Sequence, residues 1–148
     1  MTHTNPTIFL ADDDQDDRLF FEEVLEEISS KIHFTTFDNG ADLMKNLLNE
    51  SNKTPDFIFL DLKMPIMDGE ECLQEIRKLN HLSKTPIIIY STSIDVSKAE
   101  RLRDLGANLY LKKPNNFSGL KSAILNCLED LQTTLNEQDG APKFIVQL

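Results

Sequence analysis

Short apolar runs recur along this chain, and longer segments with helical periodicity separate them. There are five such runs, at residues 7–11, 32–37, 57–60, 87–90 and 109–111. Most of them are continuous rather than alternating, which is typical of strands covered on both faces, as in a parallel sheet between two layers of helices. His33, Thr35 and Thr36 interrupt the second run, so we expect that strand at an edge of the sheet.

The segments between the runs carry apolar residues at the spacing of amphipathic helices. They predict helices over residues 14–29, 41–50, 69–80, 95–105 and 117–136. Asp14 can cap the first helix, where Asp16 and Asp17 suit the positive end of the helix dipole. A closed eight-stranded barrel needs about 250 residues, so the repeated strand–helix unit favours an open α/β sheet. We therefore predict a doubly wound, flavodoxin-like three-layer sandwich with parallel strand order 2-1-3-4-5.

The charge of the chain is negative and unevenly distributed. Its 148 residues carry a formal net charge of −10, and residues 1–50 alone hold twelve acidic and three basic side chains. Nucleic-acid backbones and anionic membrane surfaces both attract basic patches, so neither partner is expected. The acidic excess is compatible with a cation or a basic protein partner, although such an excess on an exposed helix is ordinarily a solvated face.

Length and cysteine content favour one domain in a reducing compartment. Residues 1–136 are expected to form that domain, because domains commonly run to roughly 100–150 residues. Cys72 and Cys127 lack the spacing of metal ligands or of a redox pair. The N-terminus lacks a signal-peptide pattern and no run approaches the ~20 apolar residues of a membrane span, so we expect a cytoplasmic protein.

The end of the chain is expected to form a tail, residues 137–148, with no output domain. Residues 139–142, with the sequence Asp-Gly-Ala-Pro, break the last predicted helix, and residues 143–148 form a short segment with Phe144, Val146 and Leu148 on one side. This last segment is interpreted either as a frayed terminus or as a segment that docks against the domain or a partner.

Chemically distinctive side chains follow four of the predicted strands at their carboxyl ends, where open parallel sheets bind ligands. Asp12 and Asp13 follow the first strand, Asp61 the third, Ser91 the fourth and Lys113 the fifth. In the predicted order the first and third strands are neighbours, so the three carboxylates are expected to form one cluster. Clustered carboxylates repel one another, and a hard cation such as Mg²⁺, which prefers oxygen ligands, resolves that conflict.

A phosphoryl group fits the same arrangement. Mg²⁺ and Lys113 can neutralise its charge, Ser91 can donate a hydrogen bond, and a carboxylate can act as the nucleophile that forms an aspartyl phosphate. Taken singly, these residues have ordinary roles: acids cap helices, a serine after a strand lies in a turn, and a lysine before proline is a surface charge. Four separate elements that supply the groups of one site favour the functional interpretation.

The motifs that carry these residues resemble those of the receiver domain of two-component response regulators. The similarity covers about residues 6–135. It includes the strand 8–13 with its acidic pair, the loop 61–69 with the sequence DLKMPIMDG, the strand 86–92 with its hydroxyl residue, and residues 110–114, which end in Lys-Pro. In finer detail the chain is similar to small single-domain regulators that are paired with bacterial phytochromes.

The resemblance implies which residues hold the metal and the phosphoryl group. Asp61 would be phosphorylated, Asp13 would ligate Mg²⁺ directly, and Asp12 would do so directly or through water. The backbone carbonyl of Lys63 would be a further ligand, which any side chain at that position permits. We also expect the long Lys63 side chain to shield the acyl phosphate from water.

The resemblance also implies which residues contact the phosphoryl group and respond to it. Lys113 would contact the phosphate and the acidic pair, Ser91 would bind the phosphoryl group, and Tyr110 would be the aromatic switch that turns inward. Ser91 stands where threonine is frequent in the family, and it keeps the hydroxyl without the methyl group that restricts its rotamer. Thr92 stands where many members carry alanine, and it could crowd the space into which Tyr110 moves. Ser93, like Lys63, occupies a variable position that influences phosphate lifetime in the family.

The implied protein is a phosphoacceptor that signals, and not an enzyme beyond its own phosphotransfer and autodephosphorylation. A sensor histidine kinase would pass a phosphoryl group from phosphohistidine to Asp61, and a downstream protein or a phosphotransfer protein would receive the signal. Output is expected on the face formed by the helix 95–105, the strand 109–111 and the helix 117–136. The chain is expected to be a monomer, or a homodimer through that face.

Other functions fit the residues less well. Asp12 and Asp14 after a hydrophobic strand superficially resemble the motif of an aspartate-nucleophile phosphatase, but that interpretation leaves the Asp61 loop unexplained, and a phosphoryl adduct on Asp12 would identify it. A receiver-like binding module without phosphorylation would not need every group of the site. Flavin or nucleotide binding needs a phosphate loop after the first strand, where residues 12–17 are acidic instead.

Overall fold

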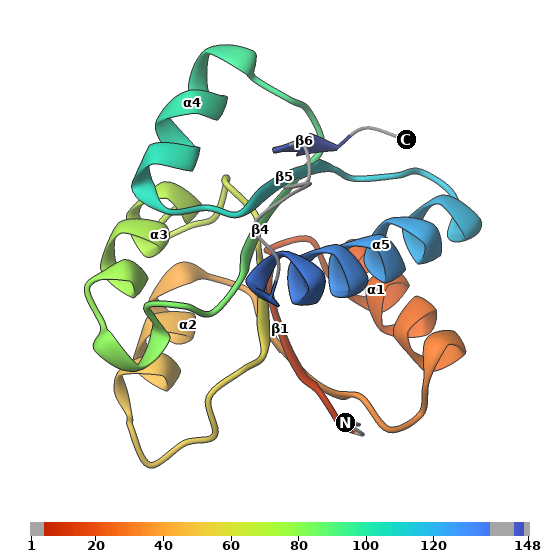
Figure 1. Ribbon diagram of the computed structural model, residues 1–148, viewed down its shortest axis with the longest axis horizontal. Helices are drawn as coiled ribbons and strands as arrows, with labels where there is room; N and C mark the ends of the chain where they lie inside the picture. The colour runs from red at the N-terminus through yellow and green to blue at the C-terminus, as the bar shows by residue number, and fades with distance from the viewer. Residues whose placement is uncertain (1–4, 137–143, 147–148) are drawn as a thin grey trace.

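A parallel sheet forms the middle layer of the protein in this computed structural model, which describes residues 5–136 and 144–146. The strands are β1 (Thr7–Ala11), β2 (His33–Phe37), β3 (Phe57–Leu60), β4 (Ile87–Ser91), β5 (Leu109–Lys112) and β6 (Ile145–Val146). Their order in the sheet is β2-β1-β3-β4-β5-β6 (Figure 1). The predicted order of the first five strands is confirmed, and β2 lies at an edge as expected.

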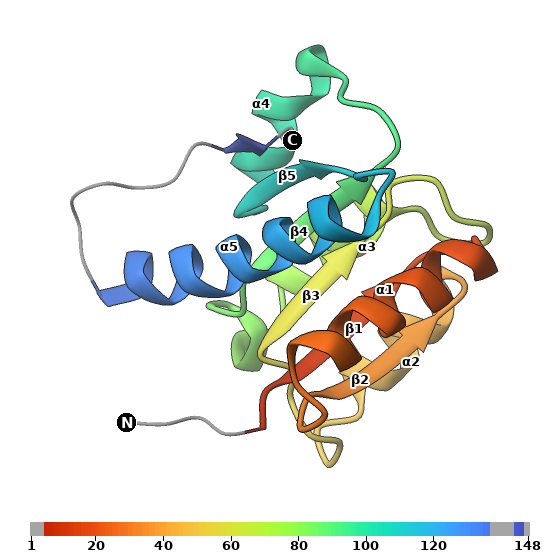
Figure 2. The same cartoon turned by 90° about the vertical axis from the view of Figure 1, so that its right-hand side faces the viewer.

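Helices cover both faces of this sheet. They are α1 (Gln15–Ile28), α2 (Gly40–Leu48), α3 (Gly69–Arg77), α4 (Val96–Leu105) and α5 (Phe117–Asn136), with a short 3-10 turn η1 (Asn80–Leu82). Figure 2 shows α1 and α5 on one face, and α2, α3 and α4 lie on the other. The predicted three-layer α/β fold is therefore confirmed.

No helix within the described ranges combines the length and the apolar character that crossing a membrane requires.

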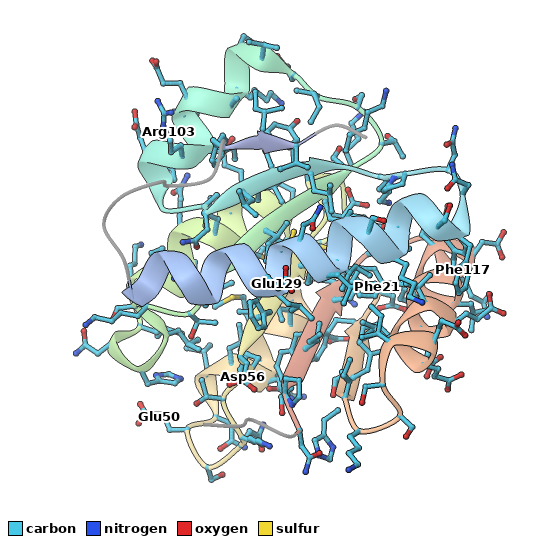
Figure 3. All side chains as sticks on the ribbon, turned by 45° about the vertical axis from the view of Figure 1, so that its right-hand side comes forward. Phe21, Glu50, Asp56, Arg103, Phe117 and Glu129 are labelled. Carbon is cyan, nitrogen blue, oxygen red and sulfur yellow. The ribbon has the colours of Figure 1, made fainter. Side chains whose placement is uncertain are left out.

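Two apolar cores lie on the two sides of the sheet, because successive strand residues point to opposite faces. Phe9 and Ala11 of β1 pack with α2, α3 and α4, whereas Ile8 and Leu10 pack with α1 and α5. Phe21 of α1 fills the second core. Figure 3 labels this side chain, between α1 and the sheet. Its ring centre lies 5.0 Å from that of Phe59 and 5.4 Å from that of Tyr90.

The third helix is shorter than the sequence predicts. Periodicity suggests a helix over 69–80, but α3 ends at Arg77 and the chain continues into η1. The helical backbone stops where Leu79 adopts extended angles, with φ −90° and ψ 119°. At this end the Arg77 guanidinium donates to the carbonyl oxygens of Gly106 at 2.8 Å and Leu82 at 2.9 Å, which ties α3 to η1 and to the turn after α4, tertiary contacts that periodicity does not contain.

The sixth strand is an element that the predicted strand order did not include. Ile145 and Val146 pair in parallel with β5, and the backbone N–H of Tyr110 donates to the carbonyl oxygen of Phe144 at 2.7 Å. The Phe144 ring lies edge-on to Tyr110 at 6.3 Å, and the Arg103 guanidinium lies 5.8 Å from the centre of the same ring. The segment 144–146 therefore docks against the domain. The predicted break at 139–142 lies outside the described residues.

Candidate functional site

The carboxyl ends of β1 and β3 place two aspartates side by side. Beyond β1, the backbone N–H of Asp12 donates to the carbonyl oxygen of Phe37 at 2.9 Å. Beyond β3, the backbone N–H of Asp61 donates to the carbonyl oxygen of Ala11 at 3.0 Å. The sheet's hydrogen bonds thus continue one residue past each strand, and they fix the backbone from which both side chains extend.

Three carboxylates meet at this edge of the sheet. Asp12, Asp13 and Asp61 each offer an oxygen, and these oxygens all lie within 4.8 Å of one another. The Asp12 side chain is inaccessible to solvent, Asp61 is 7% exposed, and Asp13 is exposed. Burial raises the pKa of Asp61 from 3.8 to about 6, and the neighbouring charge of Asp12 adds to the rise while Lys113 opposes it.

This donor set suits a hard divalent cation. Carboxylate oxygens are the ligands that Mg²⁺ prefers, and a cation would offset the repulsion from Asp12, which adds to the effect of burial on the pKa of Asp61. One exposed and two buried carboxylates leave the open side of the cluster accessible from solvent, where waters or phosphate oxygens complete such a coordination shell. The residues present therefore fit the metal that the sequence predicts.

Lys113 contributes the positive charge of the site. Its Nζ lies 2.8 Å from Asp12 Oδ2, 2.7 Å from Asp17 Oδ2 and 3.4 Å from Asp61 Oδ2. Burial alone would lower the pKa of this lysine, but the surrounding carboxylates outweigh burial and raise it, so the ammonium stays charged. Beneath it lies the ring of Tyr90, with Nζ 5.3 Å from the ring centre.

Short-range hydrogen bonds hold the acidic segment after β1. Asp12 Oδ1 accepts from the backbone N–H of Asp14 at 3.0 Å, and the Asp12 carbonyl oxygen accepts from Arg18 Nη1 at 2.7 Å. Asp14 then caps α1, as predicted, by accepting from the backbone N–H of Asp17 at 3.1 Å. The helix begins directly behind the cluster, and its first turn faces Lys113.

The loop from Asp61 to Gly69 shapes the other wall of the site. Asp61 Oδ1 accepts from the backbone N–H of Lys63 at 3.4 Å, and Gly69 donates to the carbonyl oxygen of Leu62 at 2.9 Å. A Cβ at Gly69 would lie 2.2 Å from the backbone oxygen of Asp61, so the close approach requires glycine. Ile66 has a φ of 71°, and Met67 donates across it to Pro65, which makes a tight turn at the tip of the loop.

A cavity of about 700 Å³ adjoins the acidic cluster. Its lining includes Asp13, Lys63, Ser91, Ser93 and Tyr110. Ser91 is the last residue of β4 and is 7% exposed. The carboxylates and Lys113 thus form one centre, and the predicted residues Lys63, Ser91 and Tyr110 lie around the cavity beside it.

Tyr110 is turned inward in this structure. The side chain is 1% exposed, its hydroxyl donates to the carbonyl oxygen of Ser93 at 3.2 Å, and it accepts from the backbone N–H of Asp95 at 3.1 Å. Both partners lie in the loop between β4 and α4. The tyrosine therefore links β5 to the segment that follows Ser91.

Two residues of the site have functions that the sequence analysis did not foresee. Asp17 was assigned to the helix dipole, and Tyr90 to a strand, yet both contact Lys113. A signal for Asp17 was present, because it lies four and seven residues before Phe21 and Val24, on the stripe of α1 that faces the sheet. An acid at a position of that stripe needs a partner, which only the fold reveals. For Tyr90 the sequence carries no such signal.

Comparison with known proteins agrees with this architecture. The response regulator receiver domain family matches residues 8–125. The chain is 34% identical over 133 residues to hybrid signal transduction histidine kinase D of Dictyostelium discoideum, a match that covers 87% of this chain and 8% of that protein. The chain spans only part of its curated relatives: 8% of the length of that kinase, and 28% of the length of the DNA-binding transcriptional regulator NtrC of Escherichia coli, to which it is also 34% identical.

Solved structures of response regulators share the fold. The phosphorylated cyanobacterial phytochrome response regulator RcpA superposes with a TM-score of 0.77 at 30% identity, over 88% of this chain and 96% of that one. The Mn²⁺-bound form of response regulator Rcp1, from Synechocystis, gives a TM-score of 0.73 at 26% identity, over 93% and 99% of the two chains. The family match over most of its length shows that this chain belongs to the response regulator receiver domain family.

Proposed function

We propose that Asp61 accepts a phosphoryl group from a phosphohistidine of a sensor histidine kinase. Receiver domains are signalling proteins that take phosphoryl groups from histidine kinases on an aspartate, with Mg²⁺. The observation that carries the proposal for this chain is the Asp61 carboxylate, which lies within 4.8 Å of two further carboxylates and 3.4 Å from a buried ammonium. We assign metal binding to Asp12, Asp13 and Asp61, with the backbone carbonyl of Lys63 as a further ligand.

The chemistry is a transfer between two nucleophiles. An oxygen of Asp61 forms the bond to phosphorus as the phosphorus–nitrogen bond of the donor breaks, and the departing imidazole keeps the bonding pair and takes up a proton. Mg²⁺ held by Asp12, Asp13 and Asp61 would supply positive charge to the phosphoryl oxygens. Lys113, whose Nζ lies 3.4 Å from Asp61 Oδ2, would contact the same oxygens.

Asp12 is less suited to be the nucleophile, which weakens the phosphatase alternative. The side chain is fully buried, Oδ2 is 2.8 Å from Lys113, and Oδ1 accepts a hydrogen bond from the backbone of Asp14. Both oxygens of Asp12 therefore make close contacts. The contacts of Asp61 are longer, at 3.4 Å from Oδ2 to Lys113 and 3.4 Å from Oδ1 to the backbone nitrogen of Lys63.

We assign recognition of the phosphoryl group to Ser91, and the conformational response to Tyr110. Ser91 borders the cavity beside the cluster, and its hydroxyl would donate to a phosphoryl oxygen on Asp61. The inward position of Tyr110, bonded to the loop after β4, supports a coupling between that loop and the surface of β5. Output would then appear on the face of α4, β5 and α5, to which β6 also belongs. There it would recruit a downstream or phosphotransfer protein, or a second copy of this chain.

Phosphorylation of the purified protein tests the proposal. The protein is incubated with Mg²⁺ and acetyl phosphate, or with an autophosphorylated histidine kinase where the small donor gives no product, and intact mass is measured. The expected product carries one phosphoryl group, which is absent with chelator and in Asp61→Asn. An adduct that maps to Asp12, or no adduct with either donor, would overturn the proposal.

A further inference from the structure

Asp17 makes the shortest contact to the ammonium of Lys113. The Asp17 Oδ2–Lys113 Nζ distance is 2.7 Å, whereas that to Asp61 Oδ2 is 3.4 Å. Asp17 lies in the first turn of α1, an element that supplies none of the three clustered carboxylates. It is therefore a fourth carboxylate of the site, delivered from a different part of the fold.

The ammonium has as many donors as it has carboxylate neighbours. A lysine offers three N–H donors, and here Asp12, Asp17 and Asp61 surround it. The two short contacts, at 2.8 and 2.7 Å, go to Asp12 and Asp17. Since the Lys113 side chain is only 8% exposed and lies over the Tyr90 ring, its position is set by these contacts rather than by solvent. Asp17 thus draws the charge toward α1 and away from Asp61.

We propose that Asp17 is a positioning residue for Lys113. Asp17 and Asp12 together hold the ammonium, and this leaves the Asp61 carboxylate available to a divalent cation and to the incoming phosphoryl group. This inference rests on the proposed function of Asp61. It adds to that function a residue that sets how strongly lysine and metal compete for the same oxygens.

Loss of the Asp17 charge has two consequences in the same direction. Lys113 keeps only Asp12 and Asp61 as partners, so it turns toward Asp61 and competes with the cation for that carboxylate. The site also loses one negative charge at short range, where screening by solvent is weak. Both effects weaken the binding of Mg²⁺, by about five- to tenfold for a partly exposed pair.

The test compares neutral variants of two adjacent aspartates. Asp17→Asn removes the contact, and Asp16→Asn removes the same charge from the same turn of α1 at an exposed position. Isothermal titration calorimetry of the unphosphorylated full chain gives the Mg²⁺ dissociation constant. We expect a rise of about five- to tenfold in Asp17→Asn and less than twofold in Asp16→Asn, with partial recovery in Asp17→Glu.

A second readout separates positioning from damage to the fold. With acetyl phosphate as the donor, Asp17→Asn should need a proportionally higher Mg²⁺ concentration for half-maximal phosphorylation, whereas Asp16→Asn should need the same concentration as wild type. Thermal unfolding monitors the fold, and Asp17→Ser repeats the comparison if the asparagine variant does not fold.

The outcomes distinguish this inference from the function on which it rests. If Asp17→Asn and Asp16→Asn bind Mg²⁺ equally well, Asp17 does not position Lys113 and the inference is overturned. A rate that falls at saturating Mg²⁺ with an unchanged dissociation constant would also overturn it. If the wild-type protein forms no phosphoryl adduct on Asp61, the proposed function itself fails, whatever the two aspartate variants do.

Discussion

Asp61 is a carboxylate whose surroundings oppose its charge. Burial raises its pKa from 3.8 to about 6, with a further contribution from Asp12 and partial relief from Lys113. A carboxyl group with a raised pKa in the folded state binds its proton more tightly there than in the unfolded chain. The ionised form therefore costs stability above about pH 6, and that cost fades as the pH falls toward 3.8.

Asp61→Asn should therefore stabilise the metal-free protein at neutral pH. We expect the free energy of unfolding to rise by about 1–3 kcal/mol at pH 7–8, because each unit of pKa shift corresponds to about 1.4 kcal/mol. Lys113 keeps its contacts with Asp12 and Asp17 in this variant. Urea unfolding in chelator across the pH range measures the difference, which should shrink below pH 6. The exposed Asp104→Asn is the control, and an equal gain in both variants would contradict the account.

The Lys63 side chain is expected to affect the lifetime of the acyl phosphate. It is exposed and lines the cavity beside the cluster. If the side chain shields the acyl phosphate from water, Lys63→Ala should lose the phosphoryl group a few-fold faster. Phosphate release from the phosphorylated protein, in the presence of Mg²⁺, measures the rate. Lys98, which lines the cavity from α4, provides the matched control Lys98→Ala. A lifetime in Lys63→Ala equal to that of wild type would remove the shielding role.

At the scale of elements, β6 closes the sheet beside the residue that we assign as the switch. The strand has only two residues, Ile145 and Val146, but its approach brings Phe144 against Tyr110. The backbone hydrogen bond between Tyr110 and Phe144 adds to this contact. The edge of β5 that faces outward in a five-stranded sheet is therefore paired here, and a partner on this face meets β6 as well as α4.

Phe144→Ala isolates the contribution of the ring, because the backbone hydrogen bond does not need the side chain. The ring is half-buried against Tyr110 and lies close to Arg103. We expect the free energy of unfolding to fall by about 1–2 kcal/mol, less than the loss for a fully buried phenylalanine. Urea unfolding measures the change, and Val96→Ala, at a side chain that is 71% exposed, should change it little. Unchanged stability in Phe144→Ala would mean that the docked segment does not support the sheet.

At the scale of the whole molecule, the site couples metal binding to folding. The three carboxylates come from two strand ends 49 residues apart in sequence, so the unfolded chain cannot hold them together. A ligand that binds only the folded state stabilises it in proportion to the logarithm of its concentration. The net charge of −10 adds a weaker, general attraction for cations.

Mg²⁺ should accordingly raise the unfolding temperature of the wild-type protein. At a concentration one hundred times the dissociation constant, the expected gain in the free energy of unfolding is about 2.7 kcal/mol. Differential scanning calorimetry measures it, chelator should reverse it, and NaCl at equal ionic strength controls for screening. Asp13→Asn should lose most of the gain. A gain that NaCl reproduces, or that survives in Asp13→Asn, would argue against a site at these carboxylates.

Most of the architecture could be predicted because it depends on local patterns. Apolar runs marked five strands to within about one residue, and four of these runs are continuous because a strand buried on both faces has few polar positions. Helical periodicity marked five helices, with larger errors at their ends. Where α3 ends, Arg77 binds carbonyl groups of Gly106 and Leu82, and such long-range contacts are absent from a periodicity. Strand-end position also predicted that Asp12, Asp13 and Asp61 would meet, as they do.

The sequence by itself determined the layers, the strand order and the neighbourhood of the three carboxylates, because each follows from periodicity and from the common edge at which parallel strands end. Only the tertiary structure decided how the single buried ammonium of Lys113 divides among Asp12, Asp17 and Asp61, and that β6 packs beside Tyr110. Those contacts join α1 to the end of β5, and residues 144–146 to the sheet. They depend on differences of less than an ångström in the distances between segments remote in sequence, which residue spacing along the chain does not specify.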